Sequence, residues 1–270
     1  MSAATSRAVL AVVCAVQVGA IPVVLHTQEA PASAITWLDH RQEIEDYLKV
    51  AKVVRTEDTG TGVTHPKHAF LAPGGPIGEM AWKPLPAGKM MQGYRESYKT
   101  EIAAYEMDKL IELNMVPPTV QRKQDGEEGA AIMWASPTKT FKMLGGVPTP
   151  PPQQAYRWTV QLVKAKMFDN LVGNLDPNLG NWLVDPAWNI ILIDHSRALG
   201  TGTQLTHKLE HVYAPLWDKM KALTEDQVNA SLGPWLEKKE IEAIFKRREA
   251  MQKEFDALVK KSSEAAVYLK

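Results

Sequence analysis

The chain has little cysteine and no excess of either charge. Cys14 is its one cysteine among 270 residues, which excludes an internal disulfide framework and a zinc site built from several cysteines. Lys and Arg together number 31, and so do Asp and Glu. A nucleic-acid-binding domain carries a basic surface, so this balance gives no support for a nucleic-acid partner. The sequence also lacks internal repeats, which excludes a repeat architecture.

What is present is an ordinary globular composition. Hydrophobic residues make up 45% of the chain, and its length allows one large domain or two lobes with ample cores. The pattern of segments predicts an α+β, two-lobed fold. A strand-rich small lobe is expected over residues 35–135 and a mainly helical large lobe over residues 136–270.

Residues 1–34 have the pattern of an export leader. Arg7 supplies a positive charge, residues 8–25 form an apolar run, and the Ala-Ser-Ala at 32–34 is a cleavage site that predicts a mature start at Ile35. The run is also long enough to span a bilayer, so an uncleaved membrane anchor is one alternative, and a wrongly assigned start codon is another. We expect a protein that is exported, periplasmic or secreted, or one that is held at a membrane by its N-terminus.

The small lobe begins with a short amphipathic helical pattern over residues 35–51. Apolar segments bounded by Gly, Pro and Asp turns then predict five strands, at residues 53–56, 68–71, 79–84, 120–123 and 130–134. The last two flank a Gly-containing turn, which is typical of a β-hairpin.

Two glycines and a lysine in this lobe have the chemistry of a phosphate site. Gly60 and Gly62 lie between the first two predicted strands, where backbone N–H groups can approach phosphate oxygens because no Cβ intervenes. Lys83 ends the third strand and can reach the α and β phosphates of a nucleotide. A plain turn and a solvated lysine are the alternatives, but the order of the elements favours phosphate contact.

A helical pattern covers residues 94–113, and Pro117 with Pro118 forbids its continuation. A glutamate on such a helix could hold the strand lysine in place, and Glu101 and Glu106 are both candidates. Periodicity places Glu106 nearer the apolar stripe and Glu101 on the opposite side, so the helical pattern does not select Glu101.

The connection between the lobes is expected after the fifth strand. Met133 and Trp134 would there lie beside an adenine base. A proline-rich break at 148–152 leads to an apolar helix at 154–172. Further helices are predicted near residues 205–221, 224–231 and 236–262.

The stretch that follows the helix at 154–172 carries most of the chemistry. A polar loop holds Asp176 and Asn181, and a pair of short apolar strands follows, with Asp194 predicted to end the second. Phosphoryl transfer needs a carboxylate near the attacking hydroxyl, which suits Asp176. Asn181 and Asp194 offer the oxygen ligands that a divalent metal such as Mg²⁺ takes. The alternative is an Asx-rich turn and hairpin without a catalytic role.

Three segments resemble the Fam20 family of secretory-pathway kinases. TEIAAYEMDK at 100–109 with VPPTV at 116–120 resembles the family's helix, FDNLVGNLD at 168–176 its catalytic loop, and IDHSRA at 193–198 its metal-binding segment. The wider clan, with HipA-type and phosphatidylinositol 3/4-kinase-like enzymes, is similar in its Trp-Lys-Pro at 82–84 and in the layout of Asp176, Asn181 and Asp194. The likeness covers about residues 53–200.

The resemblance implies a protein-kinase-like fold and a role for each matching residue. Lys83 would bind phosphate, and Glu101 would pair with it or help to hold metal. Asp176 would be catalytic, while Asn181 and Asp194 would bind Mg²⁺ or Mn²⁺. The implied activity is transfer of the ATP γ-phosphate to a hydroxyl of a protein or a glycan.

The chain departs from the clan's pattern at three positions. Pro177 follows Asp176 where a long side chain such as Arg is usual, Ser196 stands where glycine is frequent, and Asn181 follows the HipA and lipid-kinase pattern. These departures leave the acceptor open. The alternatives are a phosphatidylinositol-type lipid kinase and a pseudokinase that binds nucleotide without turnover. The intact set of catalytic and metal residues argues against the pseudokinase.

Overall fold

A computed structural model describes residues 31–60, 66–86, 88–91 and 94–270. Most of the expected leader and Gly62 therefore lie outside the described residues. Within the described ranges, no helix has the length and apolar character needed to cross a membrane.

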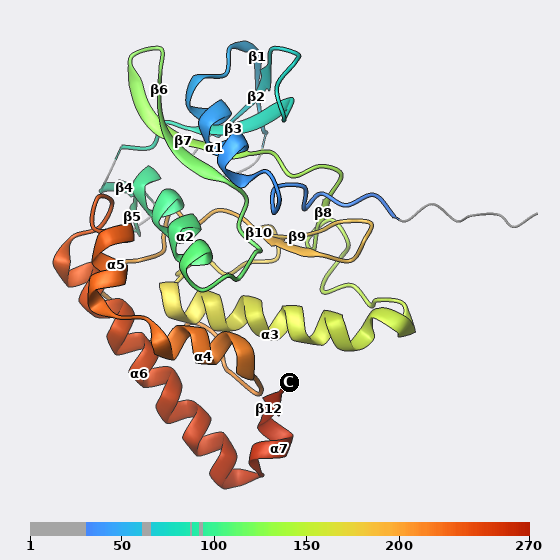
Figure 1. Ribbon diagram of the computed structural model, residues 1–270, viewed down its shortest axis with the longest axis vertical. Helices are drawn as coiled ribbons and strands as arrows, with labels where there is room; N and C mark the ends of the chain where they lie inside the picture. The colour runs from blue at the N-terminus through green and yellow to red at the C-terminus, as the bar shows by residue number, and fades with distance from the viewer. Residues whose placement is uncertain (1–30, 61–65, 87, 92–93) are drawn as a thin grey trace, which may run out of the picture. The chain divides into compact units, whose positions relative to one another are not determined.

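An antiparallel sheet forms the small lobe, with strand order β1-β2-β3-β7-β6 (Figure 1). Its strands are β1 (Val53–Asp58), β2 (Lys67–Leu71), β3 (Glu79–Lys83), β6 (Thr119–Gln124) and β7 (Glu127–Met133). The prediction of a five-stranded sheet is confirmed. The expected hairpin is β6–β7, which turns at Asp125 and Gly126, both with positive φ.

Helix α1 (Arg41–Val50) covers one face of this sheet. Ile44 and Leu48 of the helix are buried in a cluster that also contains Met80 of β3. The helix is shorter than the predicted 35–51, because the chain before Arg41 forms turns. Leu38 and Val50, two apolar residues of the predicted amphipathic segment, are 46% and 78% exposed.

Helix α2 (Tyr98–Leu110) packs on the opposite face. The predicted helix at 94–113 was four residues too long at its start, because β5 (Tyr94–Glu96) pairs with β4 (Lys89–Met91) in a small hairpin. Ser97 then caps α2, since its hydroxyl accepts the Lys99 amide proton at 3.1 Å.

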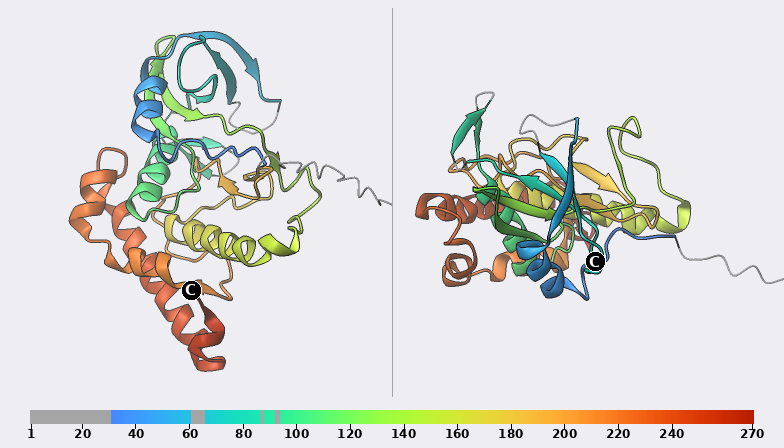
Figure 2. Two further views of the ribbon diagram at one scale, coloured as in Figure 1. Left: turned by 45° about the vertical axis from the view of Figure 1, so that its right-hand side comes forward. Right: turned by 90° about the horizontal axis from the view of Figure 1, so that it is seen from above.

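The large lobe is mainly helical (Figures 1 and 2). A 3₁₀ turn, η1 (Pro152–Gln154), precedes the long helix α3 (Ala155–Val172). Further helices are α4 (Ala214–Ala222), α5 (Glu225–Leu232), α6 (Lys238–Lys261) and α7 (Glu264–Val267), with the short strands β11 (Val212–Tyr213) and β12 (Tyr268–Leu269) paired in parallel. The helix predicted near 205–221 begins only at Ala214, whereas those expected near 224–231 and 236–262 are confirmed as α5 and α6.

A second, small sheet has the strand order β10-β9-β8, and Figure 1 shows it above α3. It consists of β8 (Lys139–Thr140), β9 (Trp182–Val184) and β10 (Ile190–Leu192). Strands β9 and β10 are the predicted apolar pair, and both are buried along their length. The polar loop before β9 and the segment after β10 are thus joined by one buried hairpin.

Candidate active site

Lys83 lies on the face of the small-lobe sheet that meets α2. Cross-strand partners share a face of a sheet and successive residues alternate, so Ala81 and its partner His68 lie on the same face as Lys83. Ala81 and Ala130, the partner of Lys83, pack with Ile102 of α2. The lysine side chain is 7% exposed.

Lys83 contacts two carboxylates that come from distant parts of the chain. Its Nζ lies 2.6 Å from Glu101 Oε1 on α2 and 2.8 Å from Asp194 Oδ1 beyond β10. The second oxygen of Glu101 accepts the His195 amide proton at 2.9 Å. Glu106, the other candidate partner, contacts Lys109 and Ser231 instead. The geometry therefore selects Glu101 over Glu106 as the partner of the lysine.

Lys83, Glu101 and Asp194 form a charged triad in which the ammonium and the carboxylates favour each other's ionised forms. Burial by itself lowers the pKa of the Lys83 ammonium, but Asp194 and Glu101 outweigh burial and raise it above its ordinary value. Burial likewise raises the pKa of Asp194, but the attraction of Lys83 exceeds it, and the pKa of the carboxyl is lowered. Lys83 is thus a cation and Asp194 an anion at neutral pH.

Asp194 does not end its strand, contrary to the sequence prediction. Strand β10 ends at Leu192, and Asp194 has φ 62°, a left-handed backbone that is uncommon outside glycine. The Ser196 hydroxyl donates to its Oδ1 at 3.1 Å. Such a backbone persists where the surroundings over-determine it, and here Lys83 fixes the same oxygen.

The loop that carries Asp176 is held by buried polar side chains at the end of α3. Every residue of the helix from Met167 to Val172 is buried, including Asp169. The Asn174 amide donates to Asp169 Oδ1 at 3.0 Å, and its own oxygen accepts the Asp176 amide proton at 3.1 Å. Asp169 also lies 3.0 Å from His207 Nε2. The backbone of the loop is therefore anchored to the core, while the Asp176 side chain is 34% exposed.

Arg247 of α6 is a second anchor, and the sequence pattern gave it no role. Its side chain is buried and donates to the carbonyls of Leu171, Gly200 and Gly202. Burial lowers the pKa of its guanidinium to about 10. The residue thereby ties the end of α3 to the segment that follows Asp194.

Asn181 lies beside Asp194 through the backbone. The Ile193 amide donates to the Asn181 carbonyl at 3.0 Å, and the Asn181 side-chain amide donates to the Asp176 carbonyl at 3.1 Å. The side-chain oxygen of Asn181 and the carboxylate of Asp194 are hard oxygen donors, which fit Mg²⁺ or Mn²⁺. In the described part of the chain, no three His, Cys, Asp or Glu side chains gather as a complete metal cluster.

Arg197 joins the site from the segment after Asp194, and sequence reasoning missed it. Its Nε lies 2.7 Å from Glu96 Oε1, and one terminal nitrogen lies 3.2 Å from Asp176 Oδ2. The motif at 193–198 contained Arg197, but nothing in the sequence placed it near Asp176.

The expected adenine end of the site contains a stacked aromatic pair. The rings of Trp134 and His68 lie 3.8 Å apart at 12°, and His68 Nε2 lies 3.2 Å from Glu79 Oε2. The Met133 side chain packs beside Met80, on the face of the sheet opposite Lys83. Trp134 therefore lies on the Lys83 side, whereas Met133 could offer a base only its backbone.

Of the two predicted phosphate-loop glycines, only Gly60 is described. It follows β1 with φ +66°, and a Cβ built on it would meet no atom within 4 Å. The backbone conformation favours glycine, while the space around it stays open.

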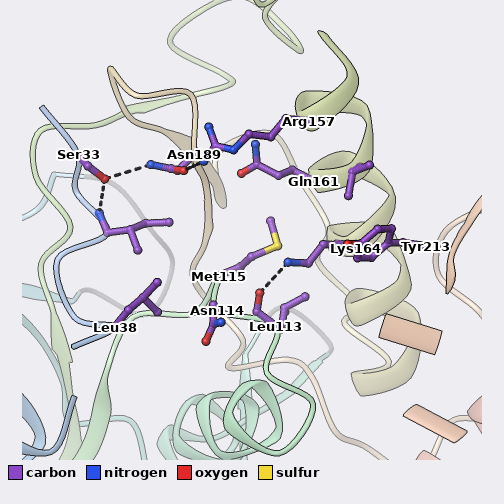
Figure 3. A pocket seen from close by; sticks show the side chains of 12 residues that line it. Ser33, Leu38, Leu113, Asn114, Met115, Arg157, Gln161, Lys164, Asn189 and Tyr213 are labelled. Carbon is purple, nitrogen blue, oxygen red and sulfur yellow. Dashed lines mark hydrogen bonds between the residues drawn. The ribbon is translucent and has the colours of Figure 1, made fainter. Parts of the chain in front are cut away.

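A separate hollow of about 420 Å³ lies between the N-terminal segment and α3 (Figure 3). Arg157, Gln161 and Lys164 of α3 point into it, opposite Ser33 and Leu38. Lys164 donates to the Leu113 carbonyl at 2.9 Å, and burial lowers its pKa. None of the predicted site residues lines this hollow. The hollow lies where residues 33–38 pack against the large lobe.

Comparison with solved structures decides the fold. A structure of hydra Fam20 with sugar matches at a TM-score of 0.64 and 15% identity, covering 85% of this chain and 92% of that chain. The Golgi casein kinase with Mn/ADP bound matches at 0.64 and 13% identity, covering 84% and 78%. The chain has the fold of an atypical protein kinase. The predicted two-lobed kinase-like fold is confirmed. No protein-family profile and no curated protein sequence matches the chain.

Proposed function

We propose that the protein is an ATP-dependent phosphotransferase that moves the γ-phosphate to a hydroxyl of a protein or a glycan. The observation that carries the proposal is the contact of Lys83 with both Glu101 and Asp194. These three residues come from β3, α2 and the segment after β10, and a buried cation shared by two carboxylates has no packing advantage over apolar side chains. The free-energy cost of burying Lys83 is explained if its ammonium binds the phosphates of a nucleotide.

Each residue has a distinct task in this proposal. Lys83 binds the α and β phosphates, with Glu101 holding its side chain in place. Asn181 and Asp194 would hold Mg²⁺ or Mn²⁺, which supplies positive charge on the phosphates. The Golgi casein kinase with bound Mn/ADP supports this choice of nucleotide and metal. Gly60 and Gly62 would lie near the phosphates, and Trp134 near the base.

Asp176 is the proposed general base. The acceptor oxygen forms a bond to the γ-phosphorus, the bond from that phosphorus to the bridging oxygen breaks, and ADP leaves with the electron pair. The hydroxyl proton passes to the Asp176 carboxylate, whose partial exposure gives an acceptor access. The loop anchors at Asp169 and Asn174 keep this carboxylate in position.

We further propose that the enzyme acts outside the cytoplasm or at a membrane. The leader pattern at residues 1–34 supports this, as does the shared fold of a kinase described as a Golgi enzyme.

The test separates binding from chemistry. Asp176→Asn should bind Mg·ATP like the parent but lose turnover by about 10² to 10⁴. Asp194→Asn should lose metal-dependent binding, because it removes the charged ligand. Calorimetric binding and transfer of labelled phosphate to protein, glycan and lipid panels would be measured for both. Parent protein that binds ATP without consuming it would identify a pseudokinase, and transfer to lipid alone would replace the proposed acceptor.

A further inference from the structure

Arg197 contacts two carboxylates that come from different segments of the chain. Its side chain is 11% exposed, and Glu96, which accepts from its Nε at 2.7 Å, is fully buried. The same guanidinium reaches Asp176 Oδ2 at 3.2 Å. A planar guanidinium with several donors can serve two such partners at once and keep a fixed direction.

The backbone holds this pair in register. The Ser97 amide donates to the Ser196 carbonyl at 3.1 Å, so the residues that follow Glu96 and precede Arg197 are hydrogen-bonded to each other. Thr100 Oγ1 lies 2.9 Å from the His195 carbonyl and strengthens the same junction. Glu96 and Arg197 are therefore side by side because two backbone segments are joined.

The positive charge on Arg197 is stabilised by its neighbours and lies beside Asp176. Burial lowers the pKa of the guanidinium, but Glu96, Asp176 and Asp194 together raise it above its ordinary value. Asp176 and Asp194 are the residues assigned to the acceptor hydroxyl and to the metal. The contact of the guanidinium with Asp176 Oδ2 at 3.2 Å puts this cation beside the carboxylate that would receive the acceptor proton.

The catalytic loop itself offers no cation. Residues 174–181 read NLDPNLGN, without Lys or Arg. The Asn178 amide, two positions after Asp176, already donates to Asp176 Oδ1 at 2.9 Å. Beyond the metal and Lys83, a further positive charge for the transferred group has to come from another segment, and Arg197 reaches Asp176 at 3.2 Å.

We propose that Arg197 binds the γ-phosphoryl group and stabilises it during transfer, and that Glu96 positions Arg197 for this task. The proposal rests on the proposed phosphotransferase function. On ATP binding, guanidinium N–H groups donate to γ-phosphoryl oxygens that gain negative charge as the bond to ADP breaks. Arg197 takes up no proton and forms no covalent bond.

The first test compares ATP with ADP, since only ATP carries the γ-phosphate. Parent protein, Arg197→Gln and Arg197→Lys are titrated with Mg·ATP and Mg·ADP by calorimetry. Arg197→Gln should bind ADP within about twofold of the parent and lose the parent's preference for ATP, while Arg197→Lys keeps part of it. Equal loss of both affinities, or an unchanged ATP preference, would overturn the proposal.

The second test follows turnover and guards against misfolding. Arg197→Gln should lower kcat by about 10² to 10³, the usual effect of one lost transition-state donor. Because that variant leaves Glu96 buried without its cation, the double variant Glu96→Gln with Arg197→Gln removes both charges and should be equally slow yet folded. Glu96→Gln alone should fall between parent and Arg197→Gln. The matched control is Arg95→Gln, which removes an exposed arginine next to Glu96 in β5 and should keep the activity of the parent.

Failure of the two proposals would look different. If the parent protein does not transfer phosphate but discriminates ATP from ADP through Arg197, the phosphotransferase function fails and the γ-phosphoryl contact stands. If the parent transfers phosphate and both Arg197 variants keep its kcat and its ATP preference, the function stands and the role of Arg197 is wrong.

Discussion

Lys83 and Glu101 form a buried ion pair, with 2.6 Å between Nζ and Oε1 and with 7% and 3% of the side chains exposed. The same ammonium neutralises Asp194 at 2.8 Å. Lys83 is thus the shared counter-ion of two acids from different lobes. Its removal leaves Glu101, which is 3% exposed, and Asp194, which is 28% exposed, without their cation, and removal of one partner is the costly way to break a buried ion pair.

Lys83→Ala should therefore destabilise the fold as well as weaken ATP binding. We expect a loss of about 3 kcal/mol in the free energy of unfolding at neutral pH. The loss should depend on pH through Asp194. Its pKa is lowered from 3.8 in the parent, so its stabilising contribution is present above that value and is lost as the pH falls through the lower folded value. The gap between parent and variant should be constant near neutral pH and narrow below about pH 4.

Urea unfolding at a series of pH values measures this gap. Lys89→Ala, which removes an exposed lysine of β4, is the matched control and should unfold like the parent at every pH. A Lys83→Ala protein that is as stable as the parent at neutral pH would show that the buried triad contributes nothing to stability.

The choice between Glu101 and Glu106 gives a second prediction. Glu101→Gln removes the charge that holds Lys83, so ATP turnover should fall at least about tenfold and stability by about 1 to 3 kcal/mol. Glu106→Gln breaks a partly exposed pair with Lys109, and should stay within about 0.5 kcal/mol and near parent activity. Steady-state kinetics and thermal unfolding of both variants decide. Loss of activity in Glu106→Gln alone would contradict the assignment.

The sequence could not select Glu101 because helical periodicity finds one apolar stripe, and α2 has no single exposed face. Thr100, Glu101, Ala103 and Ala104 are all buried, since the helix lies between the sheet and the large lobe. Strands and helices with strong local patterns, such as β9, β10 and α3, could be predicted from the sequence alone. Their apolar residues dictate burial without reference to any distant segment.

Contacts between distant segments were the part that local patterns could not supply. Asp194 was expected to end β10, but its left-handed backbone arises from what surrounds it. Arg197 and Glu96 are 101 positions apart, and only the packed fold brings them together. The family resemblance predicted the pairing of Lys83 with Glu101. A family motif includes residues that meet only in the folded protein, even though the motif gives no physical reason for their contact.

Asn174 gives a third prediction, on positioning without contact to substrate. It is 2% exposed and links Asp169 to the amide of Asp176. Asn174→Ala should shift the Asp176 carboxylate, and a misplacement of about 1 Å can cost about 10² in rate. Affinity for Mg·ATP should stay within about twofold, because Lys83 and Asp194 are untouched. The control is Asn229→Ala, an exposed helical asparagine. Weakened nucleotide binding with unchanged kcat would contradict this role.

The last prediction concerns the start of the folded chain. Ser33 Oγ and the Ala34 amide both donate to Asp185 Oδ2 at 3.0 Å, and the Asn189 amide donates to Ser33 Oγ at 3.0 Å. Asp185 is 3% exposed and Ala34 is fully buried. A chain that begins at Ile35, the start expected from the leader pattern, would lose both donors and leave this buried carboxylate with fewer partners.

A protein that begins at Ile35 should consequently be less stable than one that begins at Ser33, by about 1 to 3 kcal/mol for a buried acceptor left without its donors. Urea unfolding of the two versions measures the difference. The variant Asp185→Asn should reduce this difference in the free energy of unfolding, because a neutral amide needs fewer donors than a carboxylate. Intact mass of protein from its native host would then be expected to show Ser33 or an earlier residue first. Equal stability of the two versions would mean that these contacts are dispensable and that cleavage before Ile35 carries no cost.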